Sequence, residues 1–137
     1  MKIAGTFNFF GKVFRSGSQH PPKKITEHLS ARFPQAQSVE WNRHGALYEA
    51  LFFDNDTEMI ARFDCDGTLT ELRINVAPAR IPQFLLNNIA QEFETMNCIE
   101  VHANQSMYYE LIIRDNEFRR FLIMADKAGT ILEKTAL

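Results

Sequence analysis

The chain has 137 residues, of which 45% are hydrophobic and 23% are charged, and its formal net charge is -2 at pH 7. This length and composition predict one ordinary globular domain that buries a sizeable core. The basic residues are scattered apart from the pairs Lys23-Lys24 and Arg119-Arg120, so the basic face that nucleic-acid binding requires is missing. The sequence has no run of 18 apolar residues, so it predicts no helical membrane span.

The first 20 residues are too apolar for a free tail. Their large apolar side chains are Phe7, Phe9, Phe10, Val13 and Phe14. We expect this segment to pack on the domain as a strand or short helix, and the alternative is an arm that binds a partner or exchanges between chains. Glycine and charged residues interrupt the stretch, so it does not have the apolar centre of a secretion signal. Residues 16–21 have the composition of a linker.

Residues 22–76 resemble residues 82–136 at offsets of 60 to 62 positions. The matched positions include Pro22, Ile25, Leu29 and Phe33 with Pro82, Leu85, Ile89 and Phe93, then Tyr48-Glu49 with Tyr109-Glu110, and finally Asp64 and Gly67 with Asp126 and Gly129. Self-similarity of this kind indicates one supersecondary unit used twice. We therefore expect residues 21–137 to form a single domain built from two repeats.

Each repeat begins with a predicted helix. Ile25, Leu29 and Phe33 recur every four residues and form one apolar face, and Pro34 is expected to end that helix. The second helix starts after Pro82 and has no such stop, so it is expected to run to Glu94 or Met96.

Four strands with alternating apolar residues are expected to follow each helix. Their ranges are 39–41, 47–53, 59–64 and 68–76 in the first repeat, and 99–101, 107–114, 118–125 and 130–136 in the second. Asp-Asn and Asp-x-x-Gly turns join them, and Gly67 and Gly129 are expected to adopt positive φ. The fold class is therefore α+β. We expect two helix-plus-meander units joined into one larger antiparallel sheet, with both helices on one side.

The sequence contains no catalytic constellation. Cys65 and Cys98 have no cysteine counterpart in the other repeat, and two lone cysteines make neither a disulfide framework nor a metal site. Asp64-Cys65-Asp66-Gly67 suggests a calcium loop, but Arg62 and Arg73 would then occupy ligand positions 1 and 12. No phosphate-binding glycine loop or nucleophile motif occurs. We expect no catalytic residue, no metal site and no cofactor.

The sheet face away from the helices is the candidate binding surface, because it combines apolar side chains with Arg and Tyr, as interface cores do. The residues expected to bind a protein are Leu47, Glu49, Leu51, Phe53, Arg62, Arg73, Tyr108, Glu110 and Arg119. The alternatives are a solvated face with cross-strand ion pairs and a self-association surface.

Several motifs resemble those of the PepSY-like, beta-lactamase-inhibitor-protein-like family of bacterial envelope proteins. They are the Pro22 to Phe33 helix pattern, Val39-Glu40-Trp41, Tyr48-Glu49-Ala50 and Phe63-Asp64-x-Asp66-Gly67, with partial counterparts in the second repeat. The second repeat departs from the pattern by having Val101 where the first has Trp41. The resemblance implies a tandem helix-plus-sheet fold, a periplasmic or envelope location, and binding or inhibition of a peptidase or another envelope enzyme.

From the residues and this resemblance, we expect a non-enzymatic module that binds a protein or peptide or associates with itself. A small-ligand or calcium-responsive envelope protein is the second reading, and an enzyme is the third.

Overall fold

The computed structural model describes residues 20–137, and their contacts divide them into two units, residues 20–74 and residues 75–137. The division lies at the end of the first predicted repeat. Except for His20, the predicted N-terminal segment lies outside the described residues. Among residues 20–137, the two units contain eight strands and the helices that precede each set of four, which makes the fold α+β.

The first unit begins with helix α2 (Lys23–Arg32). Pro22 is its N-cap, and the helix ends one residue before Phe33, because Pro34 disfavours helical geometry at the residue that precedes it. Four strands follow: β1 (Gln37–His44), β2 (Leu47–Asp54), β3 (Thr57–Phe63) and β4 (Leu69–Asn75). They pair antiparallel in chain order, so this unit is the predicted helix-plus-meander.

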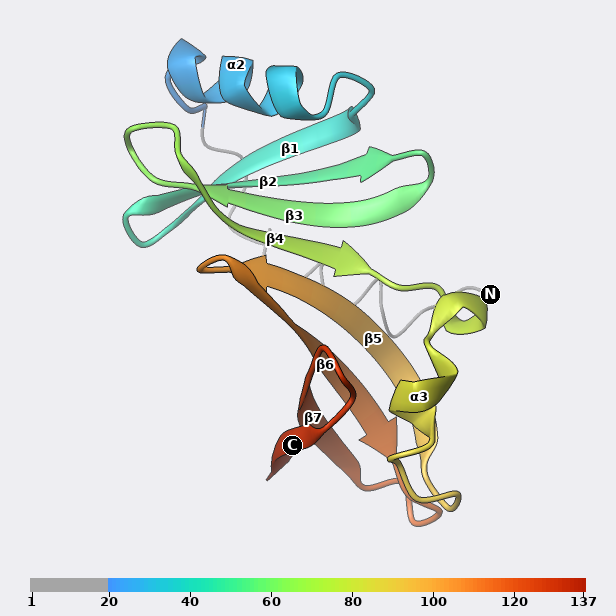
Figure 1. Ribbon diagram of the computed structural model, residues 1–137. Helices are drawn as coiled ribbons and strands as arrows, with labels where there is room; N and C mark the ends of the chain where they lie inside the picture. Colours follow the sequence, from blue (N-terminus) through green and yellow to red (C-terminus); the bar gives the residue numbers. More distant parts are fainter. Residues whose placement is uncertain (1–19) are drawn as a thin grey trace. The chain divides into compact units, whose positions relative to one another are not determined.

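Helix α2 covers one face of the sheet β1–β4 (Figure 1). Ile25 and Leu29 of α2 are 0% and 3% exposed, because they pack into a core with Phe52, Phe63 and Trp41. The helix-facing side chains of β2, β3 and β4 alternate with the residues of the predicted binding face, as a period-two pattern requires. These core and core-packing residues are Tyr48, Ala50, Phe52, Met59, Ala61, Phe63 and Leu72.

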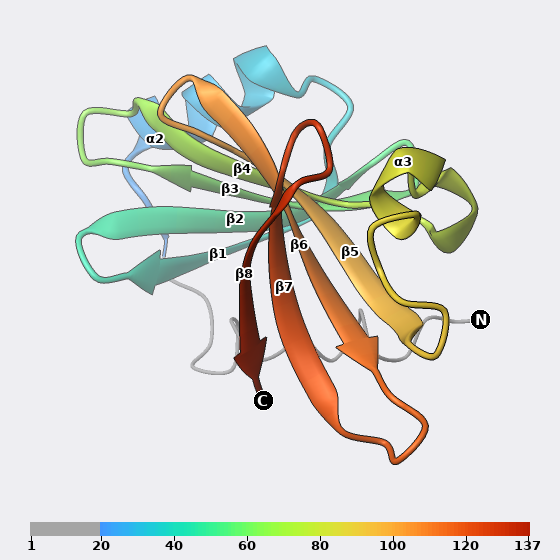
Figure 2. The same ribbon diagram turned by 60° about the horizontal axis from the view of Figure 1, so that its bottom comes forward.

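The second unit opens with a 3-10 turn, η2 (Pro78–Arg80), and the short helix α3 (Gln83–Leu86). Strands β5 (Glu94–Ala103), β6 (Ser106–Arg114), β7 (Arg120–Asp126) and β8 (Ile131–Ala136) follow. Figure 2 shows these four strands side by side, and each pairs antiparallel with the next. No helix of the described residues has the length and apolarity needed to cross a membrane.

The prediction of a second helix reaching Glu94 or Met96 is wrong. Helix α3 stops at Leu86 and is followed by Asn87 and Asn88. Asparagine is unfavourable in helix interiors, because its side chain competes for backbone hydrogen bonds. The Asn88 amide instead donates to the carbonyl of Gly129 at 2.5 Å, and Glu94 already pairs with Arg114 as part of β5. Leu85, Ile89 and Phe93 still pack on the core of this unit.

The two Asp-x-x-Gly turns have nearly the same geometry. Gly67 and Gly129 have φ values of +86° and +92°, which confirms the predicted positive φ. Asp64 Oδ1 accepts the N–H groups of Asp66 and Thr68, and Asp126 Oδ1 accepts those of Ala128 and Thr130. These matching turns agree with a duplication. The duplication itself, the joining of the two sheets and the side on which the helices lie stay predictions.

Candidate functional site

The sheet face opposite α2 is the part of the candidate surface that belongs to the first unit, and we call it the outer face. Strand alternation and register place its residues. They are Glu40 and Asn42 of β1, Leu47, Glu49, Leu51 and Phe53 of β2, Glu58, Ile60 and Arg62 of β3, and Glu71 and Arg73 of β4.

A network of charged side chains crosses this face. Glu49, Arg62 and Glu71 lie opposite one another on β2, β3 and β4. Arg62 donates from Nε to Glu49 Oε2 at 2.5 Å and from Nη1 to Glu71 Oε2 at 3.3 Å. Arg73 Nη1 donates to the same oxygen of Glu71 at 2.9 Å. Two arginines and two glutamates therefore hold three neighbouring strands together.

The side chains of this network are more buried than the anchor residues of an open binding surface would be. The Glu49 side chain is 1% exposed, and those of Arg62 and Arg73 are 17% and 11% exposed. We expected these side chains to be accessible. Their register explains the burial, because neighbouring strands bring opposite charges into direct contact and each side chain covers the next.

The apolar residues of the outer face are also less open than expected. Ile60 is 1% exposed because it lies in the middle of the face, between Leu51 and Arg73 in the register. Leu47 and Leu51 are half-buried, and Phe53 is 38% exposed. Of the apolar residues expected to bind, Phe53 is therefore open, whereas Leu47 and Leu51 are only partly accessible.

Two further residues of this area were missed in the sequence. Glu58 lies opposite Phe53, and burial raises the pKa of its carboxyl group to about 7. His44 lies at the end of β1, with its Nδ1 atom 3.7 Å from Glu49 Oε2. The sequence did contain a signal for Glu58. It lies four residues before Arg62 on the same strand, so the two side chains are expected on the same face of the sheet.

Only one of the two oxygens of the Glu49 carboxylate accepts a hydrogen bond from a described residue. Its Oε2 atom accepts from Arg62, whereas its Oε1 atom is buried and has no hydrogen-bond partner among the described residues. A buried carboxylate oxygen without a donor is unfavourable, because water no longer solvates it.

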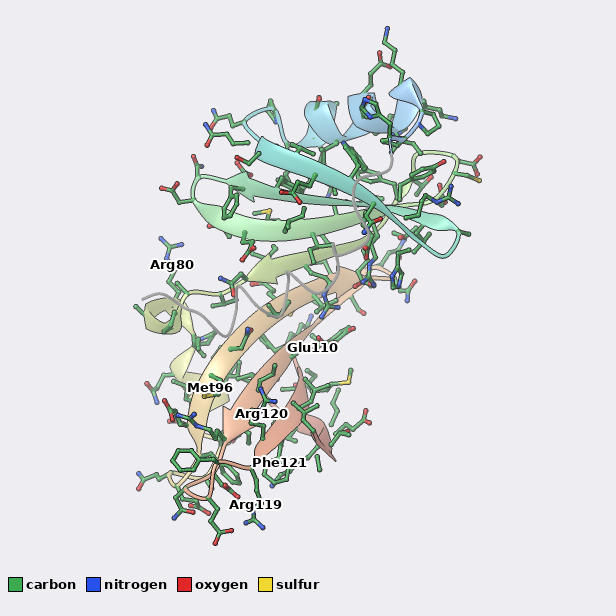
Figure 3. All side chains as sticks on the ribbon, turned by 180° about the vertical axis from the view of Figure 1, so that it is seen from behind. Arg80, Met96, Glu110, Arg119, Arg120 and Phe121 are labelled. Atoms are coloured by element: carbon green, nitrogen blue, oxygen red, sulfur yellow. The ribbon has the colours of Figure 1, made fainter. Side chains whose placement is uncertain are left out.

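In the second unit, Tyr108 and Glu110 lie on β6, on the side opposite the core residues Tyr109 and Leu111. Both are half-buried, and Glu110 pairs in the register with Ile99 and Met124. Figure 3 shows Glu110 partway along the strands of this unit and Arg119 near one end.

Arg119 is not on a strand, so its prediction as a sheet residue is wrong. Phe118 has a positive φ of +66°, and β7 begins only at Arg120. Arg119 donates from Nε to Asp115 Oδ2 at 2.7 Å and closes the β6–β7 turn. Burial alone would raise the pKa of Asp115, but the hydrogen bonds and charge of Arg119 lower that pKa below its ordinary value.

No three His, Cys, Asp or Glu side chains within residues 20–137 are arranged to hold a metal ion. The Asp64 carboxylate, which suggested calcium in the sequence, accepts two backbone N–H groups of its own turn. Cys65 is exposed and Cys98 is buried, and both are free thiols. Burial, with a smaller effect of the Glu100 charge, raises the pKa of Cys98 to about 12, so this thiol stays protonated at neutral pH.

These features define an α+β protein in which each unit combines a helix with a four-stranded antiparallel meander. No protein-family model and no curated protein sequence matches this chain. Solved structures match it at the level of fold. A DUF2874 family protein from Bacteroides uniformis has a TM-score of 0.78 and 15% identity, over 85% of this chain and 90% of that chain.

A BLIP-like protein from Bacteroides fragilis has a TM-score of 0.76 and 14% identity, over 89% of this chain and 90% of that chain. A protein from Bacteroides eggerthii, named as a candidate periplasmic protein, has a TM-score of 0.78 and 16% identity, over 86% of this chain and 90% of that one. The resemblance to BLIP-like proteins is thus confirmed for the fold. The PepSY-like part of the resemblance stays a prediction.

Proposed function

We propose that this chain is a non-enzymatic module that binds a protein or peptide through sheet surfaces, chiefly the outer face of the first unit. The observation that carries the proposal is the composition of that face. Phe53 is 38% exposed beside half-buried Leu47 and Leu51, and paired charges border them. Apolar contacts framed by polar groups are typical of protein interfaces.

The similar structures support this proposal in two ways. One of them is a BLIP-like protein, which agrees with the family that the sequence motifs resemble. Another is named as a candidate periplasmic protein, which supports an envelope location for this chain as well. Inhibition of a peptidase or another envelope enzyme is a narrower version of the same proposal, and it rests on the family resemblance in the sequence.

A small apolar ligand is the second candidate, and a hollow in the second unit favours it. This hollow has a volume of about 520 Å³ and lies where the β5–β6 and β7–β8 hairpins come together. Met107, Tyr108, Met124 and Leu132 supply its apolar lining. The hollow is open to solvent on one side, so we rank this candidate below a protein partner.

Site-specific photocrosslinking tests the proposal in the source cell or its envelope fraction. A photoreactive phenylalanine analogue replaces Phe53 in one variant and Phe118 in the control, because Phe118 is 73% exposed in a turn of the other unit. We expect an adduct with one distinct protein at position 53 and none at position 118. An adduct with a second copy of the chain would identify self-association, and the absence of any adduct at position 53 would contradict the proposal.

A further inference from the structure

We propose that the outer face of the first unit receives a lysine or arginine side chain of the partner, which donates a hydrogen bond to Glu49 Oε1. The inference rests on the proposed function, because it names the partner chemistry that the same face recognises. Three features of the face support it: the unmet hydrogen bond of Glu49, the excess of negative charge, and the spacing of residues along β2.

One oxygen of the Glu49 carboxylate lacks a hydrogen-bond donor within the described part of the chain. The side chain is 1% exposed, and Arg62 donates to Oε2 while Oε1 has no donor among residues 20–137. A group that supplies the missing donor removes the unfavourable desolvation of this oxygen, so the gain is largest at this atom. A neutral or anionic partner group would supply no charge to match the carboxylate.

The charges around Glu49 are unequal. Three carboxylates lie on the outer face, at Glu40, Glu49 and Glu71, against the two guanidinium groups of Arg62 and Arg73. The fourth carboxyl group, that of Glu58, is left out of this count because burial raises its pKa to about 7. Both guanidinium groups bind Glu71 Oε2, and Arg62 also binds Glu49. The face therefore has an excess of negative charge, which complements a cation.

An organic cation is the complementary partner, because the described residues contain no group of three His, Cys, Asp or Glu side chains suited to a metal ion. Glu49, Leu51 and Phe53 are alternate residues of β2 and point to the same face. An extended segment with a basic residue followed by apolar residues two and four positions later matches this order. The aliphatic stem of the basic residue also packs well on apolar side chains.

His44 borders the Glu49 carboxylate, with a side chain that is 55% exposed and an Nδ1 atom 3.7 Å from Glu49 Oε2. In the proposed complex, the partner side chain approaches the carboxylate beside this exposed imidazole. A lysine at position 44 would instead place a cation of the chain itself beside Glu49, and it would compete with the partner for the carboxylate.

Two peptide probes test the inference on the full chain. One is acetyl-Arg-Ser-Val-Ser-Val-amide, and the other has citrulline, which has nearly the shape of arginine but is neutral. Binding is followed by amide chemical shifts at peptide concentrations up to about 5 mM, the range in which weak contacts of this size saturate. We expect the arginine peptide to shift the amides of Glu49, Leu51 and Phe53 and to bind about tenfold more tightly than the citrulline peptide.

Matched variants separate the role of Glu49 from general charge effects. Glu49→Gln should remove the preference for arginine, whereas Glu94→Gln should keep it, because Glu94 pairs with Arg114 in the other unit at 2.7 Å. If Glu49→Gln does not fold, the exposed position 44 decides the question. His44→Lys should reduce binding of the arginine peptide about tenfold, and His44→Gln should preserve it.

Three results would overturn the inference: no shift on the outer face, equal binding of the two peptides, or an arginine preference that survives both Glu49→Gln and His44→Lys. Equal binding of both peptides at Leu51 and Phe53 would still support the proposed function and reject only the basic partner. An adduct at position 53 in the crosslinking experiment, without any arginine preference, would separate the two proposals in the same way.

Discussion

His28 of α2 donates from Nδ1 to the main-chain carbonyl of Gly67, which ties the helix of the first unit to its β3–β4 turn. Because a carbonyl oxygen only accepts, the His28 imidazole carries its proton on Nδ1. Asn88 makes the corresponding bond to Gly129 in the second unit. Two different side chains thus fix the Asp-x-x-Gly turn at matching positions of the predicted repeat.

Replacement of Gly67 by alanine should destabilise the first unit by about 2 kcal/mol, from a strained positive φ and a clash. The new Cβ would lie 2.7 Å from His28 Nδ1. Urea denaturation measures the change. Gly45→Ala is the control, because Gly45 has a φ of +61° and open space around it, and it should lose about 1 kcal/mol.

The clash can be separated from the backbone strain in a double variant. If His28→Ala is already present, Gly67→Ala should lose no more stability than Gly45→Ala does. An equal loss in the presence and absence of His28 would show that the imidazole does not contact this turn in solution.

The pH dependence of stability should report on Glu58. Burial raises the pKa of this carboxyl to about 7 in the folded chain, above its ordinary value of 4.5. The folded state then holds a proton that the unfolded state has lost between these two values. The free energy of unfolding should therefore decrease as pH rises from about 4.5 to 7, by at most about 3 kcal/mol from this one group, and by less where solvent screens the carboxylate.

Glu58→Gln removes this titration and should flatten the stability profile over that pH range. Thermal unfolding at half-unit pH intervals measures it, with Glu117→Gln as the exposed control. A profile identical to that of the wild type would mean that Glu58 titrates normally.

Calcium at millimolar concentration should not raise the melting temperature by more than about 2 °C, because a site of useful affinity would shift it further. The reason lies in the turns, where Asp64 Oδ1 and Asp126 Oδ1 each accept two backbone N–H groups. Differential scanning fluorimetry with calcium and with EDTA measures the shift. A saturable rise of several degrees would favour the calcium-responsive reading instead.

The helix-facing residues and the turn glycines were predictable from the sequence, whereas cross-strand ion pairs on the opposite face were only an alternative and their partners were not predicted. Period-two alternation fixes the face of Ala50, Phe52 and Phe63, and an Asp-x-x-Gly turn requires positive φ at its glycine. The contact of Glu49 with Arg62 depends on the register between β2 and β3. A shift of two residues would keep the apolar face but separate these side chains, so their contact depends on the geometry of the β2–β3 turn as well as on the alternation.

The short α3 and the position of Arg119 were missed for a related reason. Both depend on side chains that bind backbone groups, Asn88 at Gly129 and Asp115 at the β6–β7 turn. Such bonds override an apolar helical period or an alternating strand pattern. Ile89 and Phe93 keep their packing role without being helical, which is why the apolar pattern alone overestimated the length of the helix.

Arg62→Glu should unfold or strongly destabilise the first unit. Arg62 binds the buried Glu49 carboxylate at 2.5 Å, so a glutamate there would place two carboxylates side by side. Removal of one partner from a buried ion pair costs about 3–5 kcal/mol. Arg114→Glu is the matched control, since its partner Glu94 is 64% exposed, and it should cost about 1 kcal/mol or less. Urea midpoints of the two variants measure the difference, and equal small losses would show that the Glu49–Arg62 pair is solvated rather than buried.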